Sequence, residues 1–226
     1  MTDHTNSWQD LKAFVQPPSP SYNPAARKRA QWFLGQVPSD GKALDVGAGK
    51  QRRGPNVVTL DIVPAESVDC VADAQHLPFK DASFYGVSSS ALLEYVDDPH
   101  RVVSEVYRVL KPGGVVYFNV PFLQGYHGEP GVPDSWRVTL EGLRRLCGRF
   151  EHVESGVSNG PASAAAWLAR ELLALPLSVV PVLDPLSRFL AGWLTFWIKY
   201  LDFFLARAPA ANRVASGVYF LGRKKA

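Results

Sequence analysis

The chain has 226 residues, of which 46% are hydrophobic and 20% are charged, and its formal net charge is +3. This length is sufficient for one domain with a full core, and the composition is that of an ordinary globular protein. Two cysteines, Cys70 and Cys147, exclude a disulfide framework and fit no metal site, so we expect reduced structural thiols and no metal.

The N-terminal segment and the uneven charge indicate where the protein works. The first 20 residues are polar and then proline-rich, with no evident signal peptide, which predicts a cytoplasmic protein. Residues 163–226 hold 8 Lys and Arg against 3 Asp and Glu, whereas the rest of the chain is slightly acidic. A basic excess beside hydrophobic sequence suits an anionic membrane surface, and a helical pair with solvated basic ends is the alternative.

Short apolar runs, each bounded by turn residues, follow a short helix over 7–15, a proline-rich linker and a helix that starts at Asn23-Pro24. The predicted strands are Ala43–Val46, Val57–Leu60, Val68–Val71, Phe84–Ser88, Val115–Val120, Glu151–Ser155 and one within 215–226. Between the fourth and fifth, valines at helical spacing predict an amphipathic helix that Pro112-Gly113-Gly114 stops. This alternation predicts an α/β fold with a mostly parallel sheet.

A glycine turn and two acids follow the first strands. Gly47 and Gly49 follow the first strand, and Asp61 ends the second. Glycine lets a ligand lie against the backbone, and an acid at a strand end can accept two hydrogen bonds from a ribose diol. A plain tight turn is the alternative interpretation of the glycines. Asp73, just past the third strand, is placed to meet an adenine amino group.

The short connection between these strands selects among nucleotides. Only ten residues, Ala48–Val57, are available, and Arg52 stands where a dinucleotide-binding motif has its third glycine. A crossover helix does not fit, so a diphosphate site has little support. A ligand with ribose and adenine but no phosphate, such as S-adenosylmethionine, is favoured.

Four further segments carry a resemblance to a known family. They are "LPFKDASF" (77–84), "LLEYVDDP" (92–99), "EVYRVLKPGG" (105–114) and the block with Pro121, Phe122, His127, Asp134, Arg137, Thr139, Gly142 and Leu143. Together they resemble the class I S-adenosylmethionine-dependent methyltransferases, in the methyltransferase type 11-like branch. The resemblance covers roughly residues 40–155 and returns at 216–224.

The resemblance implies a Rossmann-like fold with seven strands, the last one antiparallel, and helices on both faces. It also implies four domain segments: an N-terminal extension (1–22), the cofactor-binding domain (23–160), a hydrophobic helical insert (161–212) and the final strand (213–226). The implied cofactor-binding residues run from the first strand to the end of the fourth: Asp45 for the amino group, Gly47 and Gly49 for the methionine part, Asp61 for the ribose, Asp73 and Ala74 for the adenine, and Ser89 for the sulfonium end. Ile62 is a further expected cofactor contact.

The chain departs from the family pattern in the glycine turn. Gln51 replaces a third glycine, and the helix that normally follows is absent. Lys50, Arg52 or Arg53 can meet the cofactor carboxylate instead, or all three can be solvated cations.

The loop after the fifth strand holds the candidate catalytic residues. A hydroxyl acceptor must lose its proton, and histidine is the usual base near neutral pH. The loop also contains Tyr126 and Glu129, but His127 is the candidate base, and Asp134 either orients it or pairs with Arg137. A purely structural loop is the alternative.

The insert is almost entirely apolar. On a helical wheel Arg188, Gly192, Thr195, Lys199 and Asp202 form one narrow stripe. Lys199 and Asp202 within Phe189–Ala206 argue against a membrane span. We expect the insert to lie in a membrane interface, to pack on the domain, or to form a homodimer through 163–207.

These features predict a methyltransferase that uses S-adenosylmethionine. The expected acceptor is a hydroxyl or carboxyl group on a small molecule, a sugar or a lipid-linked glycan, presented in the cytoplasm or peripherally at the inner face of a membrane. No basic and aromatic pattern of the nucleic-acid-binding type is present. The alternatives are a non-catalytic scaffold that binds a membrane or a protein, and an NAD(P)-dependent oxidoreductase.

Overall fold

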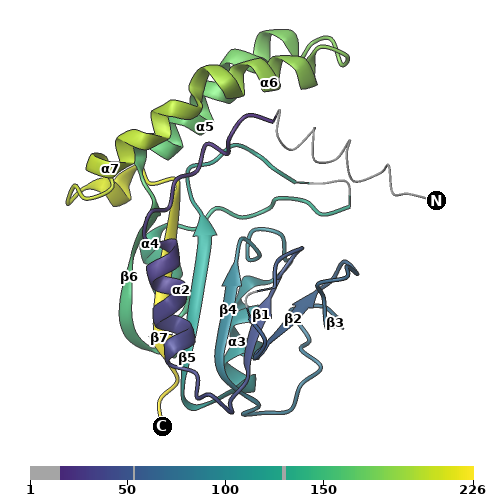
Figure 1. The fold of residues 1–226 in the computed structure, drawn as a ribbon, viewed down its shortest axis with the longest axis vertical. Helices are drawn as coiled ribbons and strands as arrows, with labels where there is room; N and C mark the ends of the chain where they lie inside the picture. Colours follow the sequence, from purple (N-terminus) through teal and green to yellow (C-terminus); the bar gives the residue numbers. More distant parts are fainter. Residues whose placement is uncertain (1–15, 53, 129–130) are drawn as a thin grey trace.

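The computed structural model describes residues 16–52, 54–128 and 131–226, so the helix expected over 7–15 and the residues Arg53 and Glu129 lie outside the described residues. A seven-stranded sheet in the order β3-β2-β1-β4-β5-β7-β6 forms the body of the molecule (Figure 1). Its strands are β1 (Ala43–Val46), β2 (Val57–Asp61), β3 (Cys70–Val71), β4 (Phe84–Ser90), β5 (Leu110–Pro121), β6 (Glu151–Asn159) and β7 (Gly217–Arg223).

The strand directions agree with the expectation. The pairs β2–β3, β1–β2, β1–β4 and β4–β5 are parallel, and β7 runs antiparallel to both of its neighbours, β5 and β6. The predicted mostly parallel seven-stranded sheet with an antiparallel last strand is confirmed. Because β1, β2, β4 and β5 are parallel, their carboxyl ends meet at one edge of the sheet.

Helices cover both faces of the sheet. The valines of α3 (Pro99–Val109) and the leucines of α4 (Leu140–Leu146) belong to the larger core, and α2 (Ala26–Gly35) contributes Phe33 to the smaller core on the other face. The start of α3 is well defined, because Asp98 accepts hydrogen bonds from the amides of His100 and Arg101 and Pro99 occupies the first turn.

Several predicted boundaries are wrong. Helix α2 starts at Ala26 rather than at Pro24, and Asn23 instead accepts a hydrogen bond from the side chain of Arg29. Helix α3 ends at Val109, before Pro112, because Leu110 is already extended and pairs with Phe84 across a bulge. Strand β3 has only two residues, since it pairs only with the end of β2 at the edge of the sheet.

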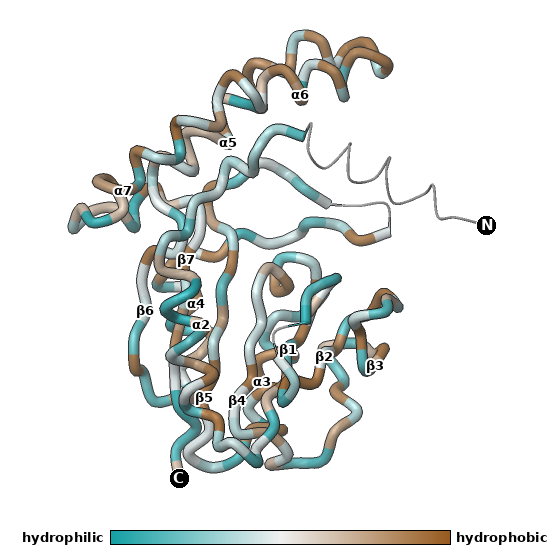
Figure 2. Tube along the Cα trace, viewed as in Figure 1, coloured by the Kyte–Doolittle hydropathy of each residue, from teal (hydrophilic) through white to brown (hydrophobic). Residues whose placement is uncertain are grey.

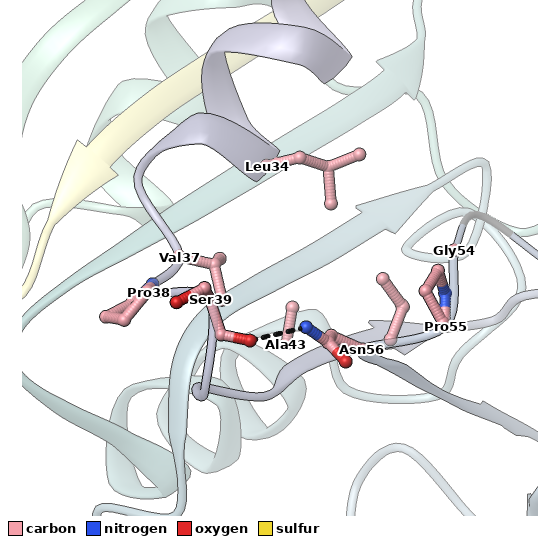
Figure 3. Close-up of a pocket in the computed structure, with 9 residues that line it drawn as sticks. Leu34, Val37, Pro38, Ser39, Ala43, Gly54, Pro55 and Asn56 are labelled. Carbon is pink, nitrogen blue, oxygen red and sulfur yellow. Dashed lines mark hydrogen bonds between the residues drawn. The ribbon is translucent and has the colours of Figure 1, made fainter.

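The connection from β1 to β2 contains no helix in its described residues, 47–52 and 54–56, as the short spacing predicts. The sheet face beside it keeps a cavity of about 240 Å³ at the amino ends of β1 and β2, with Leu34, Val37 and Pro55 on its walls (Figure 3). The Asn56 amide donates to the Ser39 carbonyl oxygen at 2.9 Å across this cavity. Ligands of such sheets bind at the opposite, carboxyl ends of the strands.

The insert forms a separate layer beyond the carboxyl end of β5 (Figure 1). Its helical segments are α5 (Pro161–Ala174), η1 (Leu175–Leu177), α6 (Asp184–Thr195), η2 (Phe196–Leu201), α7 (Asp202–Leu205) and η3 (Ala211–Arg213). The stretch Phe189–Ala206 is therefore broken rather than one helix. Within the described ranges, no helix combines the length and the apolar character needed to cross a bilayer.

Candidate active site

The glycine turn after β1 brings backbone amides next to the end of β2. Gly47 and Gly49 have φ angles of 73° and 56°, which favour glycine, and a Cβ on Gly47 would lie 3.0 Å from the side chain of Leu92. The Asp61 carboxylate accepts hydrogen bonds from the amides of Gly49 at 2.8 Å and Val63 at 3.0 Å. The turn is therefore closed over the tip of β2 by the acid that the sequence analysis selected.

A cleft of about 510 Å³ opens between this turn and the loops after β3, β4 and β5. Six of the predicted cofactor-binding residues line it: Gly47, Gly49, Asp61, Ile62, Asp73 and Ala74. Its other walls are mainly apolar and come from Leu60, Val63, Ala72, Ala91, Leu92, Tyr95, Val96, Val132 and Pro133. The cleft lies at the carboxyl edge of the sheet, where ligands of such folds bind.

Asp73 is held as a carboxylate at the wall of this cleft. Burial opposes its ionisation, but hydrogen bonds from the amide and side chain of Gln75, together with His76, lower the pKa of Asp73. With Asp61 and Asp97 it gives the cleft an acidic character.

Two predicted cofactor-binding residues do not line the cleft. Asp45 is buried in β1 and accepts a hydrogen bond from the Ser88 hydroxyl at 2.6 Å. Ser89 is also buried, and its hydroxyl has no hydrogen-bond partner among the described residues. The two side chains lie on opposite faces of the sheet, since Asp45 pairs with Ser88 and Ser89 with Val46.

Arg52, a cation of the glycine turn, faces a partner outside the cleft. Arg52 pairs with Asp69, whose carboxylate also binds the amide and hydroxyl of Thr59, and Lys50 is exposed. Arg52 therefore ties the turn to β2 instead of entering the cleft.

The loop after β5 folds His127 against two acids. The His127 amide donates to Asp134 at 3.1 Å, and its ring Nδ1 lies 2.9 Å from the Gly125 carbonyl oxygen. The buried Asp134 carboxylate also forms a two-pronged pair with Arg137. The predicted pair of Asp134 with Arg137 is therefore present, and Asp134 anchors the loop through the backbone amide of His127, whereas orientation of the imidazole ring by Asp134 stays a prediction.

Glu94, which the sequence analysis did not select, completes this cluster. It lies in the loop after β4, is 1% exposed, and neither carboxylate oxygen has a hydrogen-bond partner among the described residues. Its Oε1 is 3.9 Å from Nε2 of His127, too far for a hydrogen bond but within ion-pair range. The signal available was its place in the "LLEYVDDP" segment after a strand at the ligand edge.

The surroundings of His127 favour its protonated form. The Glu94 carboxylate raises the pKa of His127 above 6.5, burial opposes this shift, and Gly125 and Asp134 reinforce it. The rings of Tyr95 and Trp167 flank the imidazole at centroid distances of 5.7 and 6.0 Å. Tyr95 also lines the cleft, so the histidine lies beside it, under helix α5 of the insert.

Comparison with known proteins agrees with the resemblance. Residues 44–118 match the family model of the methyltransferase domain. The ubiquinone/menaquinone biosynthesis C-methyltransferase UbiE of Desulfotalea psychrophila is 57% identical over 44 residues, 20% of this chain and 18% of that protein. The ubiquinone biosynthesis O-methyltransferase of Paracidovorax citrulli is 30% identical over 139 residues, 50% of this chain and 56% of that protein.

Solved structures share the fold at low identity. Phosphoethanolamine N-methyltransferase 2 of Haemonchus contortus, solved with S-adenosyl-L-methionine, superposes with a TM-score of 0.56 at 18% identity. The alignment covers 90% of this chain and 54% of that chain. The chain spans little more than half the length of the first curated relatives it matches, or less.

Proposed function

We propose that this chain, whose residues 44–118 belong to the methyltransferase domain family, transfers the methyl group of S-adenosylmethionine to an acceptor. The acceptor is a hydroxyl or carboxyl group of a small molecule, a sugar or a lipid-linked glycan. The observation that carries the proposal is the cleft that joins a side-chain-free turn to the Asp61 carboxylate at the carboxyl edge of the sheet.

The cleft fits this cofactor in size and in chemistry. Its volume of about 510 Å³ lies within the usual range for small-molecule sites. Asp61 retains lone pairs for a ribose diol, while Ile62 and Val63 offer apolar surface to a base. Gly47 and Gly49 leave room for the amino-acid part, and the acids Asp61, Asp73 and Asp97 suit a cationic ligand.

His127 is the proposed base, and Glu94 is a positioning residue. When bound, the cofactor supplies an electrophilic methyl group, and the protein supplies orientation and proton removal. Nδ1 of His127 is directed at the Gly125 carbonyl, which leaves Nε2 to accept a proton from a hydroxyl. The buried Glu94 carboxylate stabilises the imidazolium that results.

The relatives support a small-molecule acceptor in general terms. They include a C-methyltransferase of ubiquinone and menaquinone biosynthesis, an O-methyltransferase of ubiquinone biosynthesis and a malonyl-[acyl-carrier protein] O-methyltransferase. We also propose that the chain works peripherally at a membrane surface.

Calorimetric titration with S-adenosylhomocysteine tests the cofactor site. We expect Asp61→Ala to weaken binding at least tenfold, because two hydrogen bonds to a charged group are lost. The matched control is Asp40→Ala, an exposed acid before β1 at the other end of the sheet, which should bind as the wild type does. Equal affinity of the two variants, or absence of binding by the wild type, would contradict the proposal.

The same titration separates the alternatives. An NAD(P)-dependent oxidoreductase would bind NADH and not S-adenosylhomocysteine. Residues 44–118 match a methyltransferase domain, and the described residues of the connection from β1 to β2 form no helix whose N-terminus could bind a diphosphate, so this alternative has little support. A non-catalytic scaffold would bind neither ligand, and Asp61→Ala would change nothing.

A further inference from the structure

The insert has its polar and apolar sides reversed relative to a helix of a water-soluble protein. In α6, η2 and α7 the buried side chains are mainly small or polar: Ser187, Ala191, Thr195, Lys199 and Asp202. The large apolar side chains are exposed, including Leu172, Val179, Val182, Leu190, Trp197 and Phe204. The polar stripe of the sequence analysis, apart from the exposed Arg188, therefore faces the protein.

The buried polar groups fasten the helices of the insert to one another and to the segment before α2. Asp202 accepts hydrogen bonds from the amides of Ala162 and Ser163 at the start of α5, at 2.8 and 2.9 Å. The ammonium group of Lys199 donates to the carbonyl oxygen of Ser19 at 2.6 Å. The charged groups that argued against a membrane span are thus hydrogen-bonded on the inner side and do not interrupt the outer one.

The helix contacts inside the insert use small residues. Ala162, Ser163, Ala164, Ala166 and Ala174 are the buried residues of α5. The hydroxyls of Ser187 and Thr195 bond backbone carbonyl oxygens, including those of Ala174 and Ala191. Small residues between helices and large apolar residues outside are the arrangement of helices that pack in lipid.

The turn between α5 and α6 is the most apolar part of this surface. Residues 172–183 contain no charged residue, and Ser178 is their one polar side chain. Val179 and Val182 are 83% and 84% exposed in this turn. Figure 2 shows hydrophobic residues gathered at this turn, at the end of the layer far from β6.

The margin of the surface suits an anionic bilayer. Trp193, Trp197 and Tyr200 are exposed, and such side chains favour the boundary between lipid and water. Arg207 and Arg213 are exposed near the other end of the insert, and no ion pair of the described residues involves either. Cations beside an apolar surface attract anionic headgroups.

We propose that the exposed apolar surface of residues 168–205 docks into one leaflet of an anionic lipid bilayer. The helices are too short to cross it, so the turn between α5 and α6 enters the headgroup and upper acyl region. Because Trp167 of α5 lies against His127, the bound insert would hold the cleft close to the lipid surface. Docking itself does not depend on methyl transfer.

Vesicle flotation of the full chain tests the proposal, with phosphatidylcholine vesicles and with vesicles that also contain phosphatidylglycerol. We expect the wild type to float with the anionic vesicles and the double variant Val179→Asp, Val182→Asp to float at least tenfold less. Val153→Asp, an equivalent change at an exposed valine of the edge strand β6, should float as the wild type does. If the double variant still binds S-adenosylhomocysteine with the affinity of the wild type, its reduced flotation reports a loss of docking and not a loss of fold or of cofactor binding.

Three results would overturn the proposal. The first is no flotation of the wild type with either vesicle type, and the second is equal flotation of the double variant and the wild type. The third is a stable dimer by light scattering that the two aspartates dissociate while the wild type stays off the vesicles, which would make this surface a subunit interface. Equal flotation of the wild type with both vesicle types would overturn the proposed preference for anionic lipid.

Discussion

Glu94 and His127 are two side chains whose roles depend on each other. A carboxylate buried to 1% exposure without a hydrogen-bond donor among the described residues is costly unless a positive charge is near. His127 is the nearest titratable cation, at 3.9 Å, and Arg137 is engaged by Asp134. Protonation of His127 therefore offsets the energetic cost of burying the Glu94 carboxylate. The pair can hold a proton beside the cleft.

The pair can be tested without knowledge of the acceptor. We expect the pKa of His127 to lie above 6.5 in the wild type and to fall in Glu94→Gln, because the neutral amide no longer stabilises the imidazolium. Proton NMR titration of the imidazole signals measures this pKa, and His127→Asn assigns the signal. Glu141→Gln, at an exposed glutamate in α4, should leave it unchanged. If the pKa of His127 is the same in Glu94→Gln as in the wild type, Glu94 does not stabilise the imidazolium.

The insert is held together by Asp202, a side chain of α7 that caps the N-terminus of α5, some 40 residues earlier in the chain. Helix α5 begins at Pro161 with no cap from its own N-cap residue, Gly160, and Asp202 takes that role from α7. A Cβ on Gly160 would meet the Asp202 carboxylate at 2.3 Å, so only glycine allows this approach. The cap closes the insert on itself.

Removal of this cap should loosen the insert. We expect Asp202→Ala to lower the free energy of unfolding by about 2–3 kcal/mol, since two buried amides and the Ser163 hydroxyl lose their acceptor. Urea unfolding followed by tryptophan fluorescence measures the change. Asp184→Ala, which removes a surface pair with Arg188, should cost less than about 1 kcal/mol. If the two variants lose similar amounts of unfolding free energy, the Asp202 cap contributes no more than a surface ion pair.

At the scale of the whole molecule, paired charges link stability to pH. Asp134 and Glu105 have lowered pKa values: burial opposes ionisation of Asp134 but Arg137 overcomes it, and Arg108 is the main cause for Glu105. Such groups contribute stability above their ordinary values of 3.8 and 4.5 and lose it as pH falls through the native pKa. His127, with a raised pKa, acts in the opposite sense.

Stability should therefore be highest between about pH 4.5 and 6.5 and fall on both sides within the range from pH 3 to 8. On the acid side the carboxylates become protonated. On the alkaline side the contribution of protonated His127 is lost as pH rises through its native pKa. Urea midpoints across this range measure the profile, and His127→Asn should abolish the alkaline decline only. An alkaline decline that persists in His127→Asn would assign it to another group.

Much of the fold and of the cofactor cleft could be predicted from the sequence, because the signals are local. The expected sheet is confirmed, residues 44–118 match the methyltransferase domain model, and the cleft collects six of the residues selected for it. Asp45 and Ser89 show the limit of this reasoning. Both are buried in strands, on opposite faces of the sheet, and one sequence does not state which face a ligand meets.

By itself, the amino-acid sequence determined the strands, the glycine turn and the acid at the end of β2, since each depends on neighbours in the chain. Only the tertiary structure brought Glu94 to His127, and Asp202 to the start of α5. It alone decided that the polar stripe of the insert faces inward and the leucines and tryptophans outward. The reason is physical: a helical pattern defines two faces, but which one is buried depends on what the rest of the chain places beside it.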